Sequence, residues 1–247
     1  MSAARSASCL MTALALTVST GCDSTQQQAV RARLKAERVI ASEAPTVVRR
    51  RSSQIRVVGV TLLRGSGGDA IAVRMRSSAT HPLHDLPVSV GIVARGGRRI
   101  YLNDAANVYY FKTHLASIAA RGSVTWVFTT SRELPASATP FAAVGASATV
   151  PATTVRTLPP IEISPAQSPT VSSRASGVRV RVTNASAVPQ YQLQVYAIGL
   201  ERGRYVAAGR ATIEHLGTGS SETLEIGLLG GRSATSVELE ALPTMFQ

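Results

Sequence analysis

The sequence predicts an all-β protein, and three observations support this. Val, Ala, Ser, Thr and Gly are abundant, whereas aromatic residues make up only 4% of the chain, a mix that favours short strands over a helical bundle. Apolar and polar residues alternate over several runs, as they do in strands with one buried face. Turn residues, chiefly Gly, Pro and Ser, bound these runs.

The chain has 247 residues, of which 45% are hydrophobic and 16% are charged. This composition is too apolar and too weakly charged for a disordered protein, so we expect a packed core. The length allows one large domain or two of roughly 100 residues. Only two cysteines occur, Cys9 and Cys22. Because both precede the alternating region, we expect neither a disulfide nor a thiolate metal site in the folded body.

Three alternating runs open the folded region: IRVVGVTLLR from residue 55, AIAVRMRS from residue 70 and LPVSVGIVAR from residue 86. RIYLN, GSVTWVFTT and PFAAVGASATV continue the series. A set of about six to seven strands within roughly 100 residues is typical of a β-sandwich. We therefore predict a first sandwich module over residues 55–152.

The same order of features recurs after a Pro- and Thr-rich connection at residues 153–169. GVRVRVTNAS, QYQLQVYAIGLERGRYVAAG and GTGSSETLEI echo AIAVRMRSSA, LPVSVGIVARGGRRIYLN and AARGSVTWVF. A shared order over two stretches indicates tandem modules. We predict a second module over residues 170–247, and we expect few contacts between the modules across the Pro-rich linker.

The segments VRVTNAS and LQVYAIGLERGRYVAAG precede a turn, LGTGSS, at residues 216–221, and IAARGS occupies the same place at residues 118–123. In these features the chain resembles the FxLYD-like and other immunoglobulin-like domains of bacterial surface lipoproteins, whose turn reads L-x-P-G-x-[ST]. Thr218 stands here in place of the proline. The resemblance covers most of residues 55–245 and implies two tandem immunoglobulin-like β-sandwich domains. It implies no activity, because that family shares none.

The first module carries an insertion at residues 103–121 that the second module lacks. A cluster of aromatic residues lies in and around it, and Tyr and Trp often anchor binding surfaces. One interpretation makes the insertion a binding surface, and the other makes its aromatic side chains a cap on the core. The candidate residues are Tyr109, Tyr110, Phe111 and Trp126, with Tyr101 close by.

The first 21 residues predict a signal peptide, because Arg5 precedes the apolar run CLMTALALTV and small residues follow it. The run is about ten residues long, too short to span a bilayer. The sequence VSTGC resembles the lipobox of bacterial lipoproteins, with Ser19 where that family prefers Leu. The resemblance implies diacylation of Cys22, and two acyl chains suffice for stable anchoring. The alternative is an ordinary signal cleaved at Ala13-Leu14-Ala15.

Residues 22–54 predict a lipidated N-terminus followed by a basic stalk. The middle stretch, AVRARLKAERVIASEA, lacks Gly and Pro and favours a short helix. Its arginines, with those at positions 49–51, would be drawn to an anionic surface. The alternative is a solvated spacer.

No motif of catalysis or of nucleotide binding occurs in the sequence. We therefore predict a non-enzyme with no catalytic residue and no cofactor. The candidate metal ligands are His81, His84 and His114. The metal prediction is weak, because His81 and His84 lie in a Pro-containing turn without the fixed spacing of zinc motifs.

The net charge is +12, from 26 Lys and Arg residues against 14 Asp and Glu residues. For an exported chain, such charge favours anionic lipids or wall polymers over nucleic acid. We expect a protein anchored to the outer face of the cell membrane, periplasmic or on the cell surface, that acts as a scaffold or adhesion module for another envelope component. The alternatives are capture of a small ligand or metal by the insertion, and charge-driven binding of wall polymer or nucleic acid.

Overall fold

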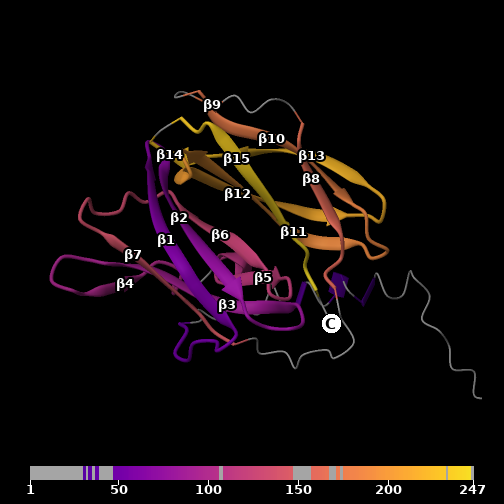
Figure 1. Ribbon diagram of the computed structural model, residues 1–247, viewed down its shortest axis with the longest axis horizontal. Helices are drawn as coiled ribbons and strands as arrows, with labels where there is room; N and C mark the ends of the chain where they lie inside the picture. The colour runs from indigo at the N-terminus through magenta and orange to yellow at the C-terminus, as the bar shows by residue number, and fades with distance from the viewer. Residues whose placement is uncertain are drawn as a thin grey trace, which may run out of the picture.

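The computed structural model describes residues 47–105, 108–146, 157–166, 171–172, 175–231 and 233–245, together with 30–31, 33–34 and 37–38. Residues 30–31, 33–34 and 37–38 are helical and lie within the predicted stalk. Elsewhere the regular structure of the described residues consists of β-strands joined by turns and loops, with a single turn of 3-10 helix, η1, at Tyr110–Lys112. The predicted all-β sandwich class is therefore confirmed (Figure 1). The predicted signal peptide, Cys22 and residues 153–156 and 167–169 of the predicted linker lie outside the described residues, whereas residues 161–165 of that linker form a strand.

Residues 55–144 form the first strand set, which consists of two antiparallel sheets. One has the order β1-β2-β6, and in the other β3 pairs with β4, β5 and β7. The strands are β1 (Ile55–Gly65), β2 (Gly68–Ser77), β3 (Leu83–Val93), β4 (Arg99–Tyr101), β5 (His114–Ile118), β6 (Ser123–Thr130) and β7 (Thr139–Val144).

Residues 161–242 form the second strand set, again with two antiparallel sheets. One has the order β13-β10-β8, with β9 on β10, and the other has the order β14-β12-β11-β15. The strands are β8 (Ile161–Pro165), β9 (Val171–Ser172), β10 (Ala175–Asn184), β11 (Gln190–Glu201), β12 (Arg204–Leu216), β13 (Ser221–Gly227), β14 (Leu229–Gly230) and β15 (Ser236–Leu242).

The order of strand pairing recurs between the two sets. Sheet β1-β2-β6 has its counterpart in β8-β10-β13, and β3 between its partners β4 and β7 has its counterpart in β11 between β12 and β15. The alternating runs of the sequence thus became strands in the order in which they were predicted. The division into two domains stays an interpretation of this recurrence.

The predicted insertion is shorter than residues 103–121, because it contains a strand. Tyr101 lies opposite Gly91, and continuing that register would place residue 105 opposite Pro87, yet His114 occupies this place. Strands β4 and β5 together therefore correspond to the single strand β12, interrupted by an excursion of nine residues. The predicted boundary failed because β5 has no strict alternation: four of its five residues are buried.

Strand β11 is buried on both faces, which joins the two strand sets. Val195 and Ala197 pack in the core of the second set, whereas Tyr196 and Ile198 pack with the core of the first set. Successive side chains of a strand point to opposite faces, so sheet β14-β12-β11-β15 lies between two apolar layers. The expectation of few contacts between the modules is therefore wrong. The run VYAIGL, residues 195–200, contains no charged or amide side chain, as expected of a strand covered on both faces.

Candidate functional site

The aromatic residues of the predicted binding surface lie in the interior. Trp126 is fully buried, and Phe111 and Tyr110 are 2% and 8% exposed. Tyr109 is half-buried, and its hydroxyl donates a 2.6 Å hydrogen bond to Gln192 of β11. These exposures contradict a contact surface made of the four side chains, and they agree with the other interpretation, a cap on the core. An aromatic-poor chain uses its few large rings where most apolar area has to be buried.

Tyr110 and His114 fasten the excursion to β3. The Tyr110 hydroxyl donates a hydrogen bond to the Asp85 carboxylate. The rings of Tyr110 and His114 stack with their centroids 4.0 Å apart. Burial, and then Asp85, raises the pKa of Tyr110 above its ordinary value. Burial lowers the pKa of His114, although Asp85 opposes this. Asp85 itself has a φ of 53°, a conformation that costs free energy in a residue with a side chain. These two pKa shifts favour the neutral forms of Tyr110 and His114, and their contacts hold the excursion against β3.

The three histidine candidates for a metal do not converge. No group of three or more His, Cys, Asp or Glu side chains among the described residues could hold a metal ion. His114 stacks on Tyr110, and its Nδ1 lies 2.8 Å from the Thr113 hydroxyl. His84 lies buried on β3, opposite Ser117.

Arg210 of β12 occupies the centre of the polar contact between the two strand sets. Its guanidinium donates to the carbonyl oxygen of Phe111 at 3.0 Å and to Oε1 of the buried Gln194 at 2.5 Å. It also lies over the ring of Tyr109, with 5.8 Å between Cζ and the ring centroid. This arginine therefore has a structural role, bonded to both strand sets.

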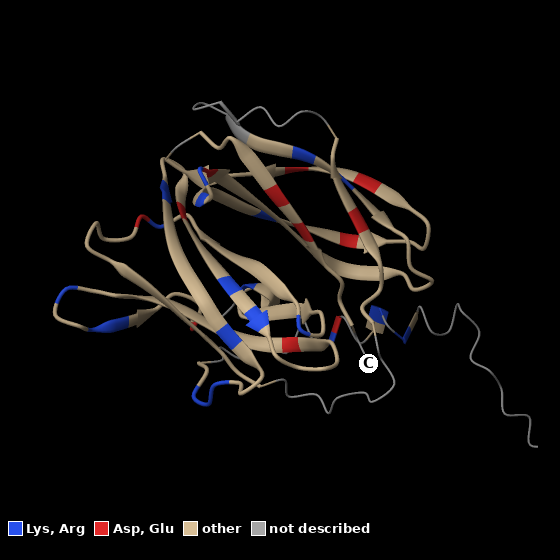
Figure 2. Cartoon of the chain, viewed as in Figure 1, with Lys and Arg blue, Asp and Glu red and all other residues tan. Residues whose placement is uncertain are grey.

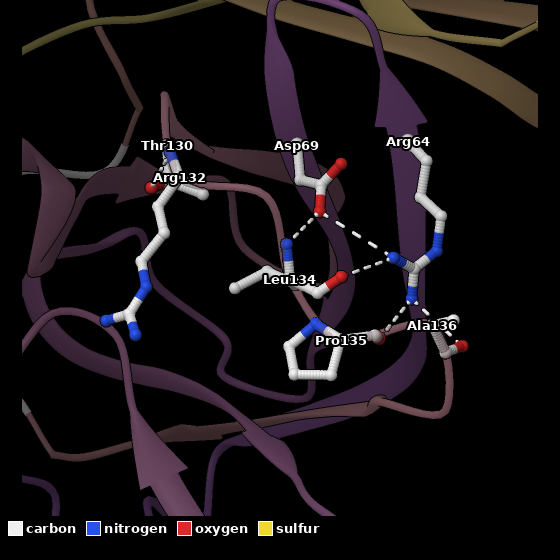
Figure 3. A network of polar contacts seen from close by, with 7 residues as sticks. All are labelled: Arg64, Asp69, Thr130, Arg132, Leu134, Pro135 and Ala136. Carbon is white, nitrogen blue, oxygen red and sulfur yellow. Dashed lines mark hydrogen bonds and ion pairs between the residues drawn. The ribbon is translucent and has the colours of Figure 1, made fainter.

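Arg64 shows how a second arginine is used within the fold (Figure 3). Its guanidinium donates to the carbonyl oxygens of Leu134 and Pro135, each at 2.7 Å, and lies 3.9 Å from the buried Asp69 carboxylate. Asp69 in turn accepts the Leu134 N–H at 2.8 Å. Arg64 thus holds the connection between β6 and β7 against the β1–β2 hairpin, and its charge is balanced.

Three other arginines of the same sheet have no such partners. Arg56 and Arg76 lie directly opposite each other on β1 and β2, and Arg74 is two residues from Arg76, so all three share one face. All three are exposed, and none forms an ion pair with a described carboxylate. Like charges placed directly opposite destabilise a sheet. We call Arg56, Arg74 and Arg76 the arginine patch.

Glu240 of β15 is a carboxyl group that interacts electrostatically with Arg74 of the arginine patch. Burial raises its pKa to about 7, while the Thr125 N–H and Arg74 oppose this effect. Thr125 donates this bond to Oε2 of Glu240 at 2.9 Å, across the contact between the strand sets. Glu240 is therefore only partly ionised at neutral pH, and it leaves the patch strongly positive.

The patch belongs to a wider imbalance of charge. Residues 47–146 carry 13 Arg and Lys residues against four Asp and Glu residues, whereas residues 157–245 carry seven of each kind. Figure 2 shows blue segments on β1, β2, the β3–β4 hairpin and the chain before β1, and red segments mainly on the second strand set. Two strand arginines of the second set face carboxylates instead: Arg179 lies opposite Glu225, and Arg204 lies opposite Glu201.

Comparisons with known proteins add little to this geometry. No protein family model matches the chain, and no curated protein matches it. Among solved structures, the YadV chaperone is similar at 13% sequence identity, over 77% of this chain and 97% of that chain, with a TM-score of 0.22. No helix within the described part of the chain is long and apolar enough to cross a membrane.

The total charge was evident from the sequence, whereas the arginine patch was not predicted from it. The signal was present in VRMRS, where Arg74 and Arg76 occupy the outward positions of an alternating strand. The register that places Arg56 against Arg76 could not be read from the sequence, because it depends on a bulge between Val57 and Gly59.

Proposed function

We propose that this chain is an exported, lipid-anchored envelope protein without catalytic activity, which binds an anionic envelope component and serves as a scaffold or adhesion module there. The observation that carries the proposal is the arginine patch. Folding alone does not require two arginines opposite each other, and their repulsion is relieved when an anion lies between them. Arginine is also the side chain best suited to phosphate and carboxylate groups.

We propose that the chain has no catalytic activity, because the groups whose pKa values are shifted, Tyr110 and Glu240, serve in structural contacts. Active sites hold groups with shifted pKa values in a cleft, ready to exchange protons. Here Tyr110 is bonded to Asp85, and Glu240 accepts the backbone N–H of Thr125. Each of these shifts accompanies a contact that holds two elements together.

The proposed anchor is Cys22, from the lipobox resemblance. We expect Cys22→Ala to move the protein from the membrane pellet to the soluble fraction, because two acyl chains hold a protein where one is marginal. Cell fractionation with and without a high-salt wash measures this. Cys9→Ala is the control and should leave the protein in the pellet. Retention of the Cys22→Ala protein in the pellet at high salt would contradict the anchor.

The proposed anionic partner is tested with the Cys22→Ala protein and isolated envelope material, in a salt series. Binding should fall steeply as salt rises, because screening shortens the reach of exposed charges. Replacing Arg56, Arg74 and Arg76 by Gln should weaken binding by tenfold or more, taking about 1 kcal/mol per cation near an anionic surface. The matched control replaces three exposed arginines of the second set, Arg179, Arg181 and Arg204. Equal weakening in both triple variants would refute a role for the patch.

A further inference from the structure

The β3–β4 hairpin ends in a tip that stands clear of the rest of the molecule. Five consecutive residues, 95–99, are exposed. The N–H of Ala94 donates to the carbonyl oxygen of Arg98 at 2.9 Å and closes the turn, and Gly96 and Gly97 have φ values of 85° and 80°. A Cβ atom built at either glycine would meet nothing within 4 Å. The tip is therefore convex, and Figure 1 shows this hairpin at the outer edge of the first strand set.

The tip carries three arginines and no carboxylate. Its sequence is ARGGRR, with Arg95, Arg98 and Arg99. Arg99 lies over the ring of Phe141, with 5.3 Å between Cζ and the ring centroid, and Phe141 makes an edge contact with Tyr101. Arg95 and Arg98 have no hydrogen bond or ion pair through their side chains within the described part of the chain.

The second strand set supplies an internal comparison. Its β11–β12 hairpin occupies the corresponding place, and its tip is also open, because a Cβ atom at Gly203 would meet nothing within 4 Å. There the sequence is ERGR, and Glu201 lies opposite Arg204 across the turn. The same fold thus builds this turn with one carboxylate and two arginines, a net charge of +1 against +3 at the β3–β4 tip. The three unbalanced arginines of the β3–β4 tip are not needed to form it.

We propose that the β3–β4 hairpin tip binds the headgroups of an acidic phospholipid bilayer. The inference rests on the proposed function, because it names the anionic component that this part of the basic strand set contacts. Arginine donates paired hydrogen bonds to phosphate oxygens. The half-buried rings of Tyr101 and Phe141 lie at the base of the hairpin, and aromatic side chains favour the boundary between headgroups and acyl chains.

The convex shape of the β3–β4 tip favours a bilayer over a soluble polymer as its binding partner. A polymer chain is held best by a groove that surrounds it, whereas a convex tip enters an array of headgroups without deforming.

The test uses the full chain with Cys22→Ala, which cannot be acylated, and vesicles of phosphatidylcholine with and without phosphatidylglycerol. Cosedimentation measures binding at low salt. In this background, Arg95→Gln with Arg98→Gln should weaken binding to the acidic vesicles by roughly tenfold or more. The matched control, Arg202→Gln with Arg204→Gln, removes the same charge from the corresponding hairpin and should change binding by less than about twofold. Replacing Arg95 and Arg98 by Lys should give binding between that of the parent and that of the Gln variant, because the charge remains while the paired hydrogen bonds to phosphate are lost.

Three results would overturn the inference: equal weakening in both Gln variants, no weakening in the β3–β4 variant, or no preference of the parent protein for acidic vesicles. Thermal melts of the Gln variants should match the parent, because both tips are exposed. If the parent ignores acidic vesicles but still binds isolated wall polymer through the arginine patch, the hairpin inference fails and the proposed function stands. If it binds neither, both fail.

Discussion

Arg210 shows how much of the contact between the strand sets depends on one side chain. It donates to Phe111 from the first set and to Gln194 from the second. We expect Arg210→Met to lower the free energy of unfolding by about 2 to 4 kcal/mol, because charged hydrogen bonds are lost and acceptors stay unpaired. Urea denaturation measures this. Arg202→Met, at an exposed turn, should change stability by less than about 0.5 kcal/mol. Similar losses in both variants would show that Arg210 does not join the sets.

Glu240 gives the stability of the protein a pH dependence. Burial raises its pKa from 4.5 to about 7, so the folded chain retains a proton that the unfolded chain releases between these two values. Stability should therefore fall as pH rises through this window. We expect Glu240→Gln to remove this dependence and to stabilise the protein at pH 8, by about 3 kcal/mol at most. Urea midpoints at pH 5 and at pH 8 test the prediction.

The control for Glu240 is Glu238→Gln. Glu238 is an exposed neighbour on β15, and its replacement should leave the difference between the two pH values in place. A parent protein that is equally stable at both values would contradict the assignment of a raised pKa to Glu240.

At the scale of elements, the excursion between β4 and β5 contributes to the core, because the η1 residues Tyr110 and Phe111 are buried. Phe111 is 2% exposed and packs edge-on against Tyr110, with centroids 5.2 Å apart. We expect Phe111→Ala to lower the free energy of unfolding by about 3 to 5 kcal/mol, as truncation of buried aromatic residues does. Chemical denaturation measures the loss. Val188→Ala, at a side chain that is 48% exposed, is the control. A loss below about 1 kcal/mol for Phe111→Ala would restore the binding-surface interpretation.

At the scale of the whole molecule, the shared core predicts that both strand sets unfold together. Ile198 and Leu242 of the second set belong to the same apolar cluster as Trp126 of the first. Trp126 is the only tryptophan, so its fluorescence reports on the first set, while far-ultraviolet circular dichroism reports on all strands. We expect the two signals to give one coincident transition in urea. Two separated transitions would show that the sets are independent units.

Removing an apolar contact between the strand sets tests the same prediction of cooperative unfolding by mutation. Ile198→Ala removes a fully buried side chain and should cost about 2 to 5 kcal/mol. If the sets are one cooperative unit, both signals should shift together in this variant.

The alternation of residues such as Val178, Val180 and Val182 was sufficient to predict strands, because period two buries one face of a sheet. The order of those strands also followed from the sequence, since turn residues mark where each one ends. The net charge and the lipobox-like segment before Cys22 led to the prediction of an anionic partner and a lipid anchor.

Tertiary structure alone decided which strands are covered twice and which charges stay unbalanced. Tyr196 and Val195 are adjacent in the chain, yet they belong to different apolar clusters, because each face of β11 is covered by a different layer of the protein. Tyr110 meets Asp85 and Arg56 meets Arg76 across the fold. Local patterns reflect the period of a strand and the positions of turns, whereas register and the packing of sheets depend on contacts between residues distant in sequence.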